Sequence, residues 1–278
     1  MNNSTMNFTT PEASTNATIH SIMTRPDILV YCINFLFGLP IHSYVIWLIV
    51  TGTGSGIASE FFNLNLSVSE IGNCLNCLFF VLSFWFSTFM ILTYFSFGIV
   101  LTARPLFQCL MCVERYLAVV HPVTFLKFKP LRYKVICSTV AWIICLCSCL
   151  VYLLIVVSEG IAHVWFISIQ FLLVLSVQLF CLSAVLRALK QSGPGEGGRE
   201  RTMESQVKRR AFYLILITTV NMVIIYVPNV ILGLYSIVIK QYIHAVWYTG
   251  WICYALAGYV QPVLYLQRTG KLSCLCSQ

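Results

Sequence analysis

Seven long apolar runs constrain this chain more than any other feature. They fall at about 27–50, 60–84, 88–118, 135–157, 164–187, 211–238 and 245–267. Each run has the roughly 20 mostly apolar residues that an α-helix needs to cross about 30 Å of hydrocarbon. Only a helix or a closed barrel can satisfy its backbone hydrogen bonds there. The pattern therefore predicts an all-α membrane protein, a bundle of seven transmembrane helices.

The charged residues predict how this bundle is oriented. The net charge of +8 could suggest a nucleic-acid partner, but 14 of the 17 lysines and arginines fall on one side of the membrane if the runs alternate. Basic loops are retained on the cytoplasmic side. The charge thus encodes topology, and we expect no nucleic-acid partner. The predicted parts are an extracellular tail (1–26), the bundle (27–267) and a short cytoplasmic tail (268–278).

Both tails carry sequence signals for covalent modification. The amino-terminal tail has four Asn-x-Ser/Thr sequons, which only an extracellular segment could use for glycosylation. These begin at Asn2, Asn3, Asn7 and Asn16. In the other tail, Cys274 and Cys276 follow Arg268 and Lys271, where a palmitoyl chain could reach the membrane; a plain unmodified tail is the alternative.

No catalytic, metal-binding or cofactor-binding arrangement is visible. The acidic residues are few and dispersed, and no His or Cys spacing typical of a metal site recurs. The 13 cysteines lie in apolar runs or in the carboxyl tail, so they predict no extracellular disulfide. We expect a membrane protein that is not an enzyme and needs no cofactor.

Four motifs identify the family that this chain resembles. They are Cys112 to Pro122, with the sequence CVERYLAVVHP; Trp142 in the fourth run; Tyr226-Val227-Pro228 in the sixth; and Gln261 to Tyr265, with the sequence QPVLY, in the seventh. With seven spans, these motifs resemble the rhodopsin-like (class A) G-protein-coupled receptors. The sequence Gly38-Leu39-Pro40 and the end of the third run also resemble the branch that includes nucleotide and lipid-mediator receptors.

The resemblance implies a plasma-membrane receptor that couples to a heterotrimeric G protein. It assigns the coupling surface to Glu114, Arg115, Tyr116, Val123 and Tyr265. In this scheme Glu114 holds Arg115 in the inactive state, because an arginine at the edge of the hydrocarbon is costly unless it is paired. Lys208 stands where many relatives place an acid that also locks Arg115, so we expect that lock to be absent.

The buried polar centre departs from the family pattern. Relatives commonly bind sodium with polar residues at positions that here are His42, Glu70, Arg104 and Gln261. Arg104 precedes Arg115 by eleven residues, close to three helical turns, so it lies on the same face about 16 Å deeper. Because Glu70 is the one opposite charge at that depth, we predict a Glu70–Arg104 salt bridge, hydrogen-bonded to His42 and Gln261, and no sensitivity to sodium. The alternative is that Arg104 faces a water-filled cavity alone.

Further residues are expected to bend helices or to line a ligand pocket. Pro228 and Pro262 should act as activation hinges, with Tyr226 in place of the usual tryptophan, and Pro105 should bend the third helix. The expected outer pocket is aromatic and has no acid, which favours an apolar or weakly polar ligand over an amine; plain interhelical packing is the alternative. Its residues are Tyr94, Phe97, Gly98, Trp247 and Trp251.

Two other functions remain open from the sequence. A seven-helix transporter or channel could use the intramembrane charges of His42, Glu70 and Arg104 for protons or anions. A decoy receptor could keep the fold without coupling to a G protein. The function that the sequence favours is a G-protein-coupled receptor for an unknown extracellular ligand.

Overall fold

The structure is a computed structural model that describes residues 26–52, 57–58, 60–128, 130–157, 162–191, 198–239 and 244–269. All of its regular elements in these ranges are helices. The four sequons, Cys274 and Cys276 lie outside the described residues, as do the side chains of Lys208, Trp247 and Trp251.

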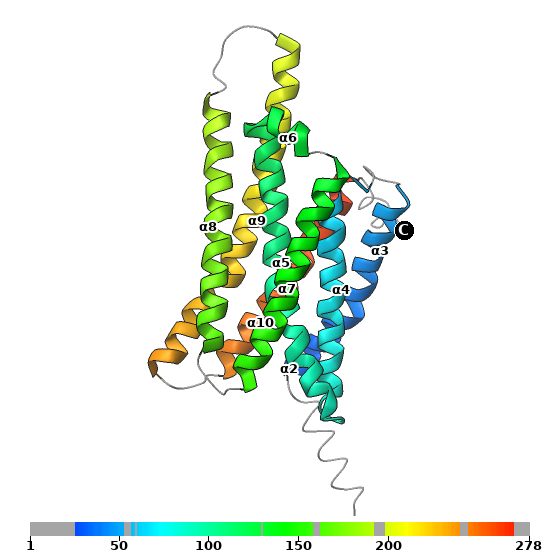
Figure 1. Cartoon of the computed structure of the whole chain (residues 1–278), viewed down its shortest axis with the longest axis vertical. Helices are drawn as coiled ribbons and strands as arrows, with labels where there is room; N and C mark the ends of the chain where they lie inside the picture. The colour runs from blue at the N-terminus through cyan, green and yellow to red at the C-terminus, as the bar shows by residue number, and fades with distance from the viewer. Residues whose placement is uncertain are drawn as a thin grey trace, which may run out of the picture.

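The helices follow the seven predicted runs in order (Figure 1). The first run is one rod made of α2 (Pro26–Ile33), the π-helical turn η1 (Asn34–Gly38) and α3 (Leu39–Val50). The next four are α4 (Phe61–Leu82), α5 (Thr88–Val120), α7 (Leu131–Val157) and α8 (Ala162–Gln191). The sixth is α9 (Gly198–Ile239), and the seventh is divided into α10 (His244–Gly258) and α11 (Val260–Arg268).

Five of these rods are long and apolar enough to span a bilayer by themselves, and α9 has a shorter apolar stretch at Phe212–Pro228. Large apolar side chains cover their outer faces, including Ile136, Leu154 and Leu173, which are 57%, 70% and 63% exposed. In water such surfaces would aggregate, whereas in a bilayer they face lipid tails. The predicted seven-helix membrane bundle is confirmed.

Several details differ from the expected boundaries. A short helix, α6 (Pro122–Phe128), follows α5, and α7 begins at Leu131, four residues earlier than predicted. The basic run before the sixth span is helical and continuous with α9, as predicted. The break in the seventh rod comes at Tyr259, three residues before Pro262, whereas α5 and α9 stay helical through Pro105 and Pro228.

Helix α5 is the centre of the bundle, because it contacts α4, α7, α8 and α9. The approach to α7 is closest at Gly98, where a Cβ atom would lie 2.4 Å from the Cα atom of Cys149. Small residues allow this kind of close backbone packing between membrane helices. Gly98 therefore faces α7 and not an outer pocket, so its predicted place among the ligand residues is wrong.

Candidate functional site: a buried ion pair below a cytoplasmic cavity

The predicted salt bridge between Glu70 and Arg104 is present at the core of the bundle. The Nε atom of Arg104 donates to Oε1 of Glu70, and its Nη2 atom donates to Oε2 at 2.6 Å, so the pair is bidentate. Both side chains are buried, with 2% and 5% of their surfaces exposed. Bidentate pairing fixes the guanidinium in one plane. The alternative of an unpaired Arg104 in a water-filled cavity is wrong for this structure.

A third helix completes the coordination of Arg104. Its Nη1 atom donates to the backbone carbonyl of Tyr254 on α10 at 2.5 Å, and its guanidinium lies 3.8 Å from the centre of the Tyr254 ring. The hydroxyl of Tyr254 in turn donates to the carbonyl of Val100 on α5. Arg104 thus connects α4, α5 and α10, which are the second, third and seventh spans.

Gly258 makes room for this pair. A Cβ atom at this position would lie 2.9 Å from Nη2 of Arg104 and 3.2 Å from Oε2 of Glu70. Any larger residue would have to displace one of the two charged groups. The end of α10 is therefore shaped around the ion pair.

The hydrogen-bonding neighbours of the ion pair differ from those that the sequence predicts. Asn73, one turn after Glu70, donates to its carboxylate at 3.4 Å, while Gln261 instead donates to the hydroxyl of Thr218 on α9 at 3.4 Å. His42 is buried, and its Nδ1 atom has no hydrogen-bond partner among the described residues. The predictions that His42 and Gln261 bond to the pair are thus wrong, because the two partners and Tyr254 already fill the positions around the guanidinium.

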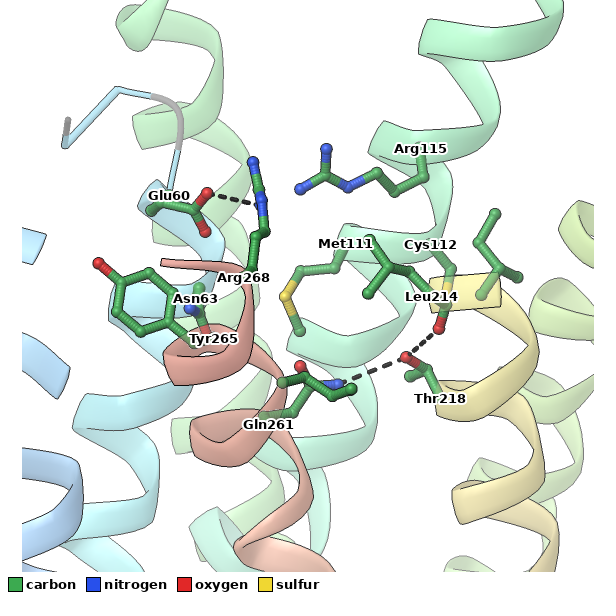
Figure 2. Close-up of a pocket in the computed structure, with 12 residues that line it drawn as sticks. Glu60, Asn63, Met111, Cys112, Arg115, Leu214, Thr218, Gln261, Tyr265 and Arg268 are labelled. Atoms are coloured by element: carbon green, nitrogen blue, oxygen red, sulfur yellow. Dashed lines mark hydrogen bonds and ion pairs between the residues drawn. The ribbon is translucent and has the colours of Figure 1, made fainter. Parts of the chain in front are cut away.

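A small cavity lies between α4, α5, α9 and α11, toward the predicted cytoplasmic end (Figure 2). Its volume is about 60 Å³, and its lining includes Arg115, Thr218, Gln261 and Tyr265. In Figure 2, Arg115 extends from α5 into the space beside the end of α11. A helix is roughly 10 Å across, so the cavity is closed to any helical partner.

An ion pair that the sequence did not predict stands at the edge of this cavity. Arg268 at the end of α11 binds Glu60, the residue before α4, at 2.8 Å (Figure 2). The Glu60 side chain is 5% exposed, and that of Arg268 is 42% exposed. This pair connects the start of the second span to the end of the seventh. The signal for it was present, since Glu60 is one of only nine acidic residues in the chain.

The predicted coupling residues divide into three places. Arg115 and Tyr265 line the cavity together, as expected from their motifs. Val123 is 70% exposed on α6, on the surface of the molecule. Tyr116 lies beside His121, with 3.1 Å between its hydroxyl and Nε2, and packs its ring against Phe180.

The predicted partner of Glu114 is wrong. Its carboxylate binds the ammonium group of Lys134 on α7, at 2.5 Å, and Lys134 also donates to the carbonyl of Ala58 at 2.8 Å. Within the described part of the chain, no ion pair involves Arg115. The early start of α7 explains the difference, because it brings Lys134 into the bundle beside Glu114 instead of leaving it in a loop.

Of the predicted hinge residues, Tyr226 and Pro262 are buried between helices, whereas Pro228 is exposed on α9. Tyr226 packs between Phe171 and Tyr254, with ring centroids 4.0 and 6.4 Å apart, and so connects α8 and α9 to the residue that holds Arg104. Pro262 is buried in α11. Phe97 packs against Tyr152 at 5.0 Å, which is the interhelical packing that the sequence left open, and Tyr94 is partly buried.

The relatives of this chain are chemokine receptors. It is 28% identical to human chemokine XC receptor 1 over 190 residues, which are 61% of this chain and 56% of the relative. It is 27% identical to human C-C chemokine receptor type 8 over 240 residues, 74% of this chain and 62% of the relative. The resemblance to rhodopsin-like G-protein-coupled receptors is confirmed. The mouse chemokine XC receptor 1 is 30% identical over 183 residues.

The extent of these similarities is limited. The chain matches less than two thirds of the length of each relative, and no family profile matches it. The relatives are receptors by name, and the predicted receptor class and multi-pass location in the plasma membrane are confirmed. They add no support for the nucleotide and lipid-mediator branch, which stays a prediction.

The occupied polar centre leads to a prediction about sodium. Because the guanidinium of Arg104 fills the space beside Glu70, a sodium ion has no carboxylate left to bind. An ion that binds the folded state would stabilise it by mass action. We expect the thermal midpoint of the purified protein to be the same in sodium chloride and in potassium chloride of equal strength. A midpoint that rises with sodium alone would contradict this assignment.

Proposed function

We propose that this chain is a G-protein-coupled receptor that transmits an extracellular signal to a heterotrimeric G protein. The main support for this proposal is the cavity at the predicted cytoplasmic end, which is lined by Arg115 of α5 and Tyr265 of α11. The sequence similarity to chemokine receptors supports the same function. We further propose that the chain has no enzymatic activity, and that the bundle lies between an extracellular tail (1–26) and a cytoplasmic tail (268–278).

Activation requires the cavity to widen, since a helical partner is larger than the present opening. An outward movement of α9 about Pro228 would separate Thr218 from Gln261 and would disturb the packing of Tyr226 on Tyr254. In this scheme Arg115 becomes available to the G protein, and Val123 on α6 supplies an exposed apolar contact. Glu114 remains with Lys134 and supports the end of α5.

The ligand class is also a proposal. The aromatic residues Tyr94, Phe97, Trp247 and Trp251 and the absence of an acid among them favour an apolar or weakly polar ligand. The relatives are named for chemokines, so a chemokine is the second class to test. Against a transporter, the intramembrane charges of Glu70 and Arg104 are fully paired with each other.

The test measures G-protein activation without added ligand in cells that display the chain at known surface density. Because Arg115 has no ion pair within the described residues, and Lys208 replaces the usual locking acid, we expect basal activation of at least one of the four G-protein classes. Replacing Arg115 with alanine should remove most of this signal. The matched control, Arg187→Ala, deletes an exposed arginine of α8 outside the cavity and should leave the signal unchanged.

Three other outcomes would each contradict a part of this proposal. A signal that survives Arg115→Ala would mean that the cavity is not the coupling site. If all four G-protein classes remain silent, with both apolar compounds and chemokines added, the chain is a decoy. An ionic current under voltage clamp without G-protein activation would instead support the channel.

A further inference from the structure

A second cavity lies on the side of the bundle, between α5, α6 and α7. Its volume is about 220 Å³. Its walls are formed by Phe62 of α4, Leu110 and Val113 of α5, Phe125 of α6, and Tyr133 and Cys137 of α7. Four different helices thus converge on one apolar space. It is lined by other residues of α5 than the cavity that holds Arg115, so the two cavities lie on different faces of this helix.

The charged groups of this second cavity are already neutralised. Glu114 and Lys134 are the charged residues in its lining, and they bind each other. Lys134 makes an additional hydrogen bond to the carbonyl of Ala58. The interior consequently offers apolar surface to an occupant, and the inner part of a ligand has to be apolar as well.

The rim of the cavity faces the bilayer. Cys137 is an exposed residue of α7, and its neighbours Ile136 and Val140 are 57% and 51% exposed on the same membrane-spanning helix. Leu126 on α6 is 63% exposed. Because α7 is long and apolar enough to span a bilayer, lipid tails would surround its exposed residues, and an acyl chain can enter the cavity from there.

An exposed positive charge lies next to the rim. Arg132 is exposed, with its guanidinium carbon 4.9 Å from the ring centre of Tyr133, a residue of the cavity wall. Its Nη2 atom donates to the Tyr133 hydroxyl at 3.4 Å. Lys127 adds a second exposed cation in the last turn of α6. Basic sites at the cytoplasmic ends of membrane helices attract anionic lipid headgroups.

We propose that this cavity binds an anionic phospholipid of the cytoplasmic leaflet. One acyl chain occupies the space between α5, α6 and α7, and the phosphate contacts Arg132. The bound lipid would brace α6 against the bundle, because Phe125 forms one of the cavity walls. This inference does not depend on G-protein coupling, since it concerns lipid binding alone.

The experiment counts lipids retained by the purified chain in native mass spectrometry. Phosphatidylglycerol and phosphatidylcholine with identical acyl chains are added separately. We expect phosphatidylglycerol to be retained about five-fold more strongly, the effect of roughly one basic residue near the headgroup. Arg132→Gln should remove most of this preference, with Lys127 left as the remaining cation, and Arg209→Gln, which removes another exposed arginine, should leave it unchanged.

A second pair of variants tests the acyl-chain cavity. Cys137→Trp should fill the rim and reduce retention of both lipids, while Ile136→Trp adds the same ring at an adjacent exposed position outside the cavity lining. If Cys137→Trp lowers the thermal midpoint, the smaller Cys137→Phe replaces it. Equal retention of the two lipids by the unaltered chain, equal effects of the two arginine variants, or equal effects of the two tryptophan variants would each overturn the proposal.

Discussion

Replacing Arg104 with alanine should destabilise the bundle more than removal of any single charge outside the Glu70–Arg104 pair. The change would leave the carboxylate of Glu70 buried without its cation, and breaking a buried pair in this way typically costs about 3 to 5 kcal/mol. It would also remove the hydrogen bond to the carbonyl of Tyr254, which holds α10 against α5. For a chain of this size we expect the thermal midpoint to fall by roughly 6 to 20 °C.

The measurement can use the thiols of the chain itself. Cys74, Cys77 and Cys112 are buried and free, so a thiol-reactive fluorophore reports their exposure on heating. Arg115→Ala is the matched control, because it removes an arginine from the same helix at the cavity, where no described residue forms an ion pair with it. If both variants lose the same small amount of stability, the pair does not hold the helices together.

The second large effect is expected from a single added methyl group at Gly98. An alanine Cβ at this position would lie 2.4 Å from the Cα atom and 2.7 Å from the backbone nitrogen of Cys149. Backbone atoms cannot move aside as a flexible side chain can, so α5 and α7 would have to separate. We expect Gly98→Ala to abolish most of the folded protein recovered from membranes.

Gly72→Ala is the matched control for this prediction. Gly72 also lies within a membrane helix, but the nearest atom to its added Cβ would be 3.9 Å away, on Ile99. Alanine favours a helix over glycine by about 1 kcal/mol, so this variant should be at least as stable as the unaltered chain. Size-exclusion chromatography in detergent gives the yield of both variants. A normal yield of Gly98→Ala would show that the two helices do not approach as closely as described.

The ion pair between Glu70 and Arg104 could be predicted from the sequence because few charged residues lie within the apolar runs. Glu70 and Arg104 are opposite charges at the same depth, and an unpaired charge there is costly. The same reasoning could not find the carbonyl of Tyr254 as a partner, since every residue carries a carbonyl and only the packing of α10 selects this one. Asn73 could have been found, because it lies one turn from Glu70 on the same helix.

The partners near the helix ends were harder to predict than those at the core. Helix α7 begins four residues earlier than predicted, which places Lys134 beside Glu114. Glu114 therefore pairs with Lys134, and Arg115 lines the cavity instead of pairing with Glu114. Helix ends depend on local hydrogen bonds and on neighbouring loops, whereas the spans depend on long apolar runs. The pair of Glu60 and Arg268 illustrates the same difficulty, because it joins two helix ends that are far apart in the sequence.

A double-mutant cycle on Glu70 and Arg104 tests the account most directly. The thermal stability of Glu70→Ala, Arg104→Ala and the double variant is measured against the unaltered chain. A buried pair predicts that the double variant loses far less than the sum of the two single losses, with a coupling of roughly 2 to 3 kcal/mol. Strictly additive losses would show that the two side chains do not interact, and the ion pair at the centre of the bundle would have to be abandoned.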